Sequence, residues 1–130
     1  MTACPCDPSR AYAQCCEPLH RGAPAADAEA LMRSRYSAFV LGDAAYLLRS
    51  WHAGTRPQDI AFDPTLRWLG LEVRRHVPEG DRATVEFVAR SRAGGGPAHR
   101  LHEISRFLRE DGHWYYVDGT FPAGPPPRRL

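Results

Sequence analysis

The sequence has 130 residues and a formal net charge of +2, with 17 basic side chains that are all arginine against 15 acidic ones. Hydrophobic residues make up 43% of the chain and charged residues 25%, which is typical of one globular domain with its own core. No stretch approaches the roughly 20 apolar residues of a membrane span, so we expect no membrane association. The small net charge gives no indication of strong nucleic-acid binding.

All four cysteines lie near the start of the sequence, as a C-x-C pair of Cys4 and Cys6 followed by adjacent Cys15 and Cys16. Four thiolates complete a tetrahedral zinc site, with Zn–S distances of about 2.3 Å. The first residues show no secretory pattern, so we expect a cytoplasmic protein, in which clustered cysteines favour metal over disulfides. The sequence therefore predicts a knuckle that holds Zn²⁺ through these four residues. Iron suits the same ligands, and redox-active or unligated thiols are the alternatives.

The spacing C-x-C-x8-C-C resembles the SEC-C motif, a zinc knuckle found in several bacterial proteins. Pro5, Ser9 and Tyr12 also match this motif, and the basic stretch between the cysteine pairs is reduced to Arg10. The resemblance implies zinc binding and a protein partner that contacts the knuckle. Because the basic residues are mostly missing, we expect nucleic-acid or ribosome contact to be weak.

Two helices are predicted after a linker that ends near Ala26. Asp27 is a suitable N-cap for a helix that runs to about Leu41, and Gly42 provides its C-terminal stop. Asp43 caps a second, shorter helix, and the chain is then irregular from residue 52 to residue 64. Apolar residues form one stripe along the first helix, with Arg35 in its middle; they are Ala28, Leu31, Met32, Tyr36, Phe39 and Val40.

Four strands are predicted after the helices, at Trp68–Val77, Arg82–Arg92, Leu101–Arg109 and His113–Thr120. The turn sequence Asp111-Gly112 indicates a two-residue hairpin between the last two. Helices followed by an antiparallel meander predict an α+β fold. We expect a knuckle over residues 1–20, an α+β domain over 27–121 and a proline-rich tail over 122–130.

Separated motifs along this domain resemble the YchJ family of small bacterial proteins, which carry an N-terminal SEC-C motif. The matching segments are Leu31–Val40, Tyr46-Leu47, Ser50–His52, Trp68–Leu71, Ser105–Leu108 and Trp114–Thr120. The resemblance implies a nuclear transport factor 2-like cone, in which a curved antiparallel sheet wraps around helices and often leaves a pocket. It implies no defined activity, and it makes a homodimer through the sheet a further expectation.

A polar cluster is predicted inside the cone. With a two-residue turn, strand alternation places Glu103 and Asp118 on one face together with large aromatic side chains. A buried carboxylate needs a partner, and Arg35 is the natural one. The hypothesis is that Arg35 meets Glu103 or Asp118 beneath the helix. Further candidate ligand-binding residues are Trp51, Trp68 and Tyr116.

Two functions follow from these patterns. The first is a cytosolic zinc-binding adaptor that presents its knuckle to a protein partner, with the polar cluster as a structural ion pair. The alternative is a small enzyme or small-ligand binder that uses Asp118, Glu103 or His52 in acid–base roles. Arginines at Arg74-Arg75 and at Arg90-Ser91-Arg92 alternate with acids along the sequence, and we interpret them as a solvated face of mixed charge.

Overall fold

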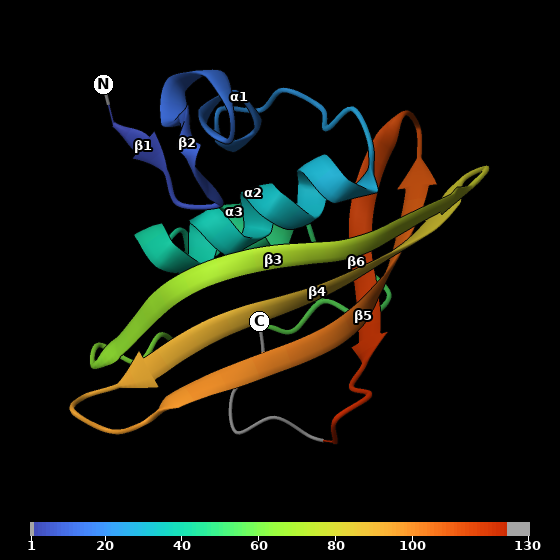
Figure 1. The fold of residues 1–130 in the computed structure, drawn as a ribbon. Coiled ribbons are helices and arrows are strands. Elements are labelled where there is room, and N and C mark those ends of the chain that lie inside the picture. The colour runs from blue at the N-terminus through green and yellow to red at the C-terminus, as the bar shows by residue number, and fades with distance from the viewer. Residues whose placement is uncertain (1, 125–130) are drawn as a thin grey trace.

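The computed structural model describes residues 2–124, and Figure 1 shows its layers: a small N-terminal knuckle, two helices and a long antiparallel sheet. Residues 125–130, most of the predicted tail, lie outside the described residues. The knuckle consists of the short strands β1 (Ala3–Cys4) and β2 (Asp7–Ala11), a 3-10 turn η1 (Tyr12–Gln14) and one helical turn α1 (Glu17–His20). The α+β class and the knuckle predicted from the sequence are confirmed.

The two main helices begin and end where their capping residues predict. Helix α2 spans Ala28–Leu41, and the Asp27 side chain accepts a hydrogen bond from the Ala30 amide. Gly42 ends the helix in the left-handed conformation, at φ 72°. Helix α3 spans Ala44–Arg49 and is capped by Asp43, which accepts from the Tyr46 amide.

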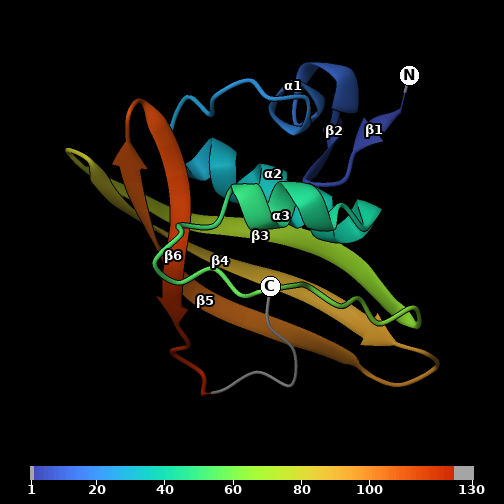
Figure 2. The same ribbon diagram turned by 180° about the vertical axis from the view of Figure 1, so that it is seen from behind.

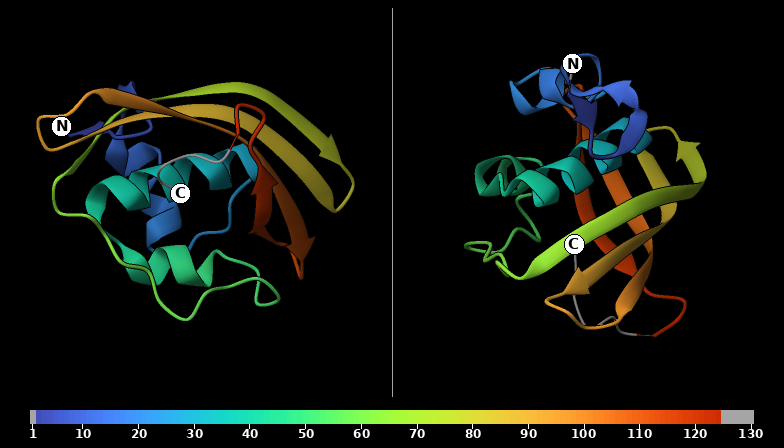
Figure 3. Two further views of the ribbon diagram at one scale, coloured as in Figure 1. Left: turned by 90° about the horizontal axis from the view of Figure 1, so that it is seen from below. Right: turned by 60° about the vertical axis from the view of Figure 1, so that its left-hand side comes forward.

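The sheet is a four-stranded meander in the order β3-β4-β5-β6. Its strands are β3 (Leu66–Glu79), β4 (Arg82–Ala93), β5 (Ala98–Glu110) and β6 (His113–Thr120). Strands β5 and β6 meet in the predicted hairpin, where Asp111 and Gly112 both have positive φ. Figures 2 and 3 show the sheet curving around α2 and α3, so that its concave face covers the helices.

The segment after α3 covers the free edge of β6. Ser50 and His52 exchange backbone hydrogen bonds with Tyr116, at 2.9 and 2.7 Å, and Trp51 forms a parallel bridge with Tyr116. An exposed strand edge invites pairing with other chains, so this segment closes one side of the sheet. None of the helices within residues 2–124 has the length and apolar character needed to cross a bilayer.

Three bulges in the sheet change which side chains face inward. In β3 the register shifts between Trp68 and Gly70, which leaves Leu69 43% exposed although alternation predicts it inside. A second shift follows between Val73 and Arg75. The third lies in the β5–β6 pair, where Arg106 faces Asp118 and Phe107 faces Tyr116.

Knuckle, helix and sheet share one core. Cys4, Cys6 and Cys16 belong to the same cluster of buried residues as Tyr36 of α2 and Phe87 of β4. Each of these three cysteines is no more than 3% exposed. The knuckle is therefore seated against α2 and has part of its ligand set in the common interior, as its position above α2 in Figure 1 indicates.

Candidate metal centre and interior polar cluster

Each cysteine of the knuckle is positioned by a short element. Cys4 ends β1, and the tight turn through Pro5 returns the chain to β2, so that Cys6 lies beside Cys4. Cys15 follows the η1 turn, and Cys16 is the N-cap of α1. Adjacent cysteines can reach one ion when they lie at a helix start, and that is where Cys15 and Cys16 are found.

The four sulfur atoms lie at the spacing of a tetrahedral metal site. Cys6 Sγ is 3.6 Å from Cys4 Sγ, 3.5 Å from Cys15 Sγ and 3.6 Å from Cys16 Sγ, and Cys15 Sγ is 3.9 Å from Cys16 Sγ. All four lie within 4.8 Å of one another. A tetrahedron with Zn–S bonds of about 2.3 Å has edges of about 3.8 Å. The sulfur atoms are too far apart for disulfides, which need about 2.05 Å, so the cluster has the composition and geometry of a metal site.

The electrostatics of the cluster also favour a cation. The pKa of Cys6 is lowered to about 5, mainly because the Cys16 thiol donates a hydrogen bond to its sulfur. The same contact raises the pKa of Cys16, and burial raises the pKa of Cys15 to about 11. Without a cation, Cys6 is therefore a thiolate beside the protonated thiols of Cys15 and Cys16. A bound dication would allow these two sulfurs to ionise.

Side chains outside the knuckle contact the cysteines. The Ser37 hydroxyl of α2 donates to Cys16 Sγ at 3.2 Å and lies 3.6 Å from Cys4 Sγ. Arg33 Nη1 donates to the Cys6 carbonyl at 3.4 Å, while its Nε pairs with Glu29 one helical turn earlier, at 3.0 Å. Helix α2 thus supplies a second layer of hydrogen bonds to the site, of the kind that orients metal ligands.

His20 joins the knuckle to the helix on a second side. Its Nε2–H donates to the Ser34 carbonyl at 2.8 Å, since a carbonyl can only accept, and its Nδ1 lies 2.7 Å from the Tyr12 hydroxyl. The His20 ring also packs edge-on against Tyr46, with centroids 4.6 Å apart. Ser37 and His20 were not predicted as site residues. The signal available was weak: a serine beside the apolar stripe of the helix, and a histidine just after the motif.

The interior polar cluster contains Arg35, as predicted, and the helix buries this side chain to 5% exposure. Arg35 Nη1 donates to the Leu47 carbonyl at 2.8 Å and to Ser50 Oγ at 2.6 Å. Its guanidinium carbon lies 5.0 Å from the centroid of the Trp51 ring and 4.6 Å from that of Tyr116. Desolvation lowers the pKa of Arg35 to about 10. Two aromatic faces and α3 therefore hold this cation.

Glu103 reaches the same cluster through Tyr116. The Tyr116 hydroxyl donates to Glu103 Oε2 at 2.9 Å, and Ser105 Oγ donates to the same oxygen at 2.6 Å. The Tyr116 ring thus lies between Arg35 and the carboxylate, so the predicted meeting of Arg35 with Glu103 is mediated by an aromatic ring. The cavity between these groups has a volume of about 10 Å³, room for about one water.

The prediction that Asp118 lies in this cluster is wrong. The bulge beside Val117 turns Asp118 to the outer face of the sheet, where it forms a close ion pair with Arg106. That pair lowers the pKa of Asp118 through the hydrogen bonds from Arg106. The prediction assumed that side chains alternate without interruption along both strands of the hairpin, which holds only where there is no bulge. Gly119 is the only local sequence signal for the bulge at Val117.

Three further predicted candidates, Trp51, Trp68 and His52, do not line the Arg35 cavity, although Trp51 contacts the Arg35 guanidinium. His52 accepts from the Gly54 amide at 3.0 Å and bonds Glu110 Oε2 at 3.1 Å on the surface. These two hydrogen bonds give His52 a structural role and not the acid–base role of the alternative prediction. Trp68 packs edge-on against Tyr36, with ring centroids 5.7 Å apart, and does not line the cavity.

Comparisons with known proteins agree on one family. The family model described as the YchJ middle NTF2-like domain matches residues 27–119. A UPF0225 protein of Xanthomonas campestris is 57% identical over 118 residues, which cover 88% of this chain and 92% of that protein. A UPF0225 protein of Ralstonia nicotianae is 55% identical over 131 residues, with 90% of each chain covered.

Two solved structures are similar to this chain over most of its length. The solution structure of a SEC-C motif containing protein from Rhodopseudomonas palustris has a TM-score of 0.82 and 38% identity, covering 92% of this chain and 98% of that one. The crystal structure of a SEC-C motif containing protein from Psychrobacter arcticus has a TM-score of 0.70 and 29% identity, covering 96% and 85%. With its NTF2-like domain and its N-terminal four-cysteine knuckle, this chain belongs to the YchJ family.

Proposed function

We propose that the protein is a cytosolic zinc-binding adaptor. Zn²⁺ is held by Cys4, Cys6, Cys15 and Cys16, and the knuckle presents its outer surface to a protein partner. The observation that carries this proposal is the tetrahedral spacing of the four sulfur atoms, 3.5 to 3.9 Å between neighbours. Among divalent metals, zinc takes a closed shell of four thiolates in structural sites.

An adaptor role is supported by the exposed outer side of the knuckle, which is available to a partner. Its inner side, with Cys4, Cys6 and Cys16, is buried against α2, whereas Pro8, Ser9 and Arg10 of β2 are exposed. Zinc therefore has two consequences in this proposal. It fixes the knuckle on the helix, and it holds β2 in one conformation on the surface, which lowers the entropic cost of binding a partner.

The alternative, a small enzyme or ligand binder, needs space for a substrate beside Glu103. The cavity lined by Arg35, Glu103 and Tyr116 holds about one water, and Asp118 and His52 are turned to the surface. The geometry of these residues therefore favours a structural role for the polar cluster.

Elemental analysis of freshly purified protein tests the metal, and affinity capture tests the partner. We expect about one zinc per chain, lost in a Cys15→Ser/Cys16→Ser variant. Affinity capture is then compared for the immobilised wild type, for that variant and for an Arg10→Ala/Ser9→Ala variant that keeps all four cysteines. This comparison separates metal binding from partner binding. Iron in place of zinc would overturn the metal assignment, and partners that bind all three forms equally would overturn the adaptor role.

A further inference from the structure

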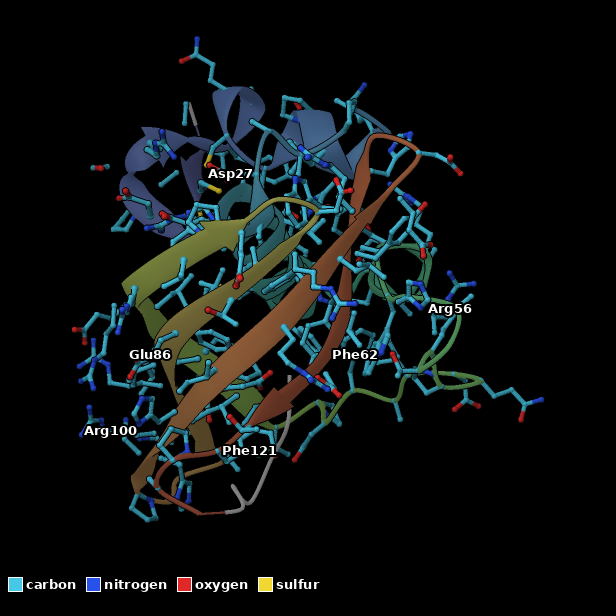
Figure 4. The ribbon with its side chains drawn as sticks, turned by 90° about the vertical axis from the view of Figure 1, so that its right-hand side faces the viewer. Asp27, Arg56, Phe62, Glu86, Arg100 and Phe121 are labelled. Atoms are coloured by element: carbon cyan, nitrogen blue, oxygen red, sulfur yellow. The ribbon has the colours of Figure 1, made fainter. Side chains whose placement is uncertain are left out.

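The outer face of the sheet carries four arginines in two neighbouring rows. Arg67 of β3 faces Arg92 of β4, and Arg90 of β4 faces Arg100 of β5. Their inward neighbours are Trp68 and Ser91 in one row and Ala89 and Leu101 in the next, so the arginines point away from the helices. Figure 4 shows Arg100 projecting from this face, away from the interior. We call Arg67, Arg90, Arg92 and Arg100 the arginine patch.

The patch contains no carboxylate. Within residues 2–124, none of its four members takes part in an ion pair of 4 Å or less, and all four are exposed. Glu72 lies on the next outward row, opposite Val88, and contacts Arg74. Glu86 and Asp118 lie further along the strands, where they contact His102 and Arg106. The mixed charge predicted from the sequence order is thus separated in space by the strand register.

Such a patch opposes folding. Like charges directly opposite one another across strands are destabilising, and here two such pairs share β4. The Arg90 side chain lies over Gly70, where a Cβ would be 3.3 Å from Arg90 Nη2, so a larger residue at position 70 would crowd the guanidinium. The arrangement gives no stability to the sheet, which points to an external anion.

The chemistry of the patch selects the anion. Guanidinium groups form paired hydrogen bonds with phosphate oxygens. Residues two apart on a strand are about 6.6 Å apart and neighbouring strands about 4.8 Å, so the patch spans roughly 10 Å. A nucleic-acid duplex carries about six phosphate charges over that length. The two rows hold no aromatic side chain on which an unpaired base could stack, which favours a duplex backbone over a single strand.

We propose that the arginine patch binds the phosphate backbone of a nucleic-acid duplex without reading its sequence. This surface is separate from the cysteine knuckle and does not require the metal. It goes against the expectation of weak nucleic-acid contact drawn from the sequence, because that expectation rested on the small net charge and on the missing basic residues of the knuckle, and neither describes this face of the sheet. The partner would be double-stranded RNA or DNA, which share this chemistry.

The test measures binding of fluorescent duplexes of about 20 base pairs, RNA and DNA, between about 50 and 200 mM salt. With four phosphate contacts, the slope of log affinity against log salt should be about −3.6, a loss of roughly 100-fold over this range. Arg90→Gln/Arg92→Gln should weaken binding roughly tenfold or more at low salt and halve the slope to about −1.8. Arg90→Lys/Arg92→Lys, which keeps the charge, should keep most of the slope.

A matched control removes the same net charge elsewhere. Arg21→Gln/Arg82→Gln changes two exposed arginines outside the patch and should leave affinity and slope within about twofold. Equal weakening by both double variants would show a mere net-charge effect and overturn the proposal. Absence of duplex binding by the folded wild type would also overturn it, as would tighter patch-dependent binding of a polyglutamate peptide, which would assign the patch to an acidic protein.

Discussion

The Ser37 hydroxyl of α2 donates a hydrogen bond to Cys16 Sγ at 3.2 Å, so the helix of the cone contacts the ligand set of the knuckle directly. Both residues are buried, at 0% and 2% exposure. Hydrogen bonds of this kind stabilise a thiolate and fix the orientation of a ligand. The contact joins two parts of the chain that the sequence suggests are separate.

Replacing Ser37 with alanine should therefore weaken metal binding by about tenfold or more, because Cys16 loses its donor. Competition with a chromophoric chelator measures this affinity. Ser34→Ala is the matched control: Ser34 is equally buried on the same helix, but its hydroxyl contacts the Leu31 carbonyl and Tyr46. It should lower the free energy of unfolding by about 1–2 kcal/mol and leave metal affinity unchanged. Equal effects on affinity would contradict the role assigned to Ser37.

Metal affinity should rise steeply with pH. In the metal-free protein the pKa of Cys6 is about 5, whereas those of Cys15 and Cys16 are raised, the former to about 11. Near neutral pH, Cys6 is ionised and the other two must each release a proton when the ion binds. Log affinity should therefore increase by at least about 2 per pH unit near pH 7, and acid should release the metal. Chelator competition across pH tests this, and a slope near 1 would contradict it.

The parts of the fold that depend on local chemistry could be predicted, and those that depend on register could not. Asp27, Gly42 and Asp43 mark the helix ends because capping involves only neighbouring backbone groups. Likewise, Asp111-Gly112 predicts its hairpin because both residues must adopt positive φ. The four metal-ligand candidates are recognisable from composition and spacing.

Register is set by contacts between distant strands. The bulge at Val117 moves Asp118 to the outer face, and the pairing of β3, β4 and β5 gathers arginines that alternate with acids along the chain. The seating of the knuckle on Ser37 is likewise a tertiary contact with no local signal. A site assembled across strands is therefore the part that sequence patterns predict least well.

Arg35 should be essential for the packing of α2 on the sheet. Arg35→Ala would leave a hole between Trp51 and Tyr116 and remove the donor to Leu47 and Ser50, so we expect a loss of about 3 kcal/mol or more in unfolding free energy. Arg35→Met, which fills the space without a charge, should cost much less. Urea denaturation measures both. If methionine were as damaging as alanine, the hydrogen bonds and charge of Arg35 would outweigh its packing.

Gly119 marks the point where β6 passes the carboxylate of Glu103. A Cβ at position 119 would lie 2.2 Å from Glu103 Oε2, well inside contact distance. Glu103 is fixed by Tyr116 and Ser105 and has 1% exposure, so it cannot move aside freely. Gly119→Ala should therefore lower the free energy of unfolding by about 2 kcal/mol or more through overpacking.

The effect of Gly119→Ala should depend on the Glu103 side chain. In a Glu103→Ala background the clash is gone, so Gly119→Ala should lower the free energy of unfolding by at least about 1 kcal/mol less than it does in the wild type. This difference is the coupling energy in a double-mutant cycle. Gly95→Ala is the control, because a Cβ there meets nothing within 4 Å. Additive losses from the two substitutions would mean that Gly119 is required for the backbone of the bulge and not for the close approach of the carboxylate.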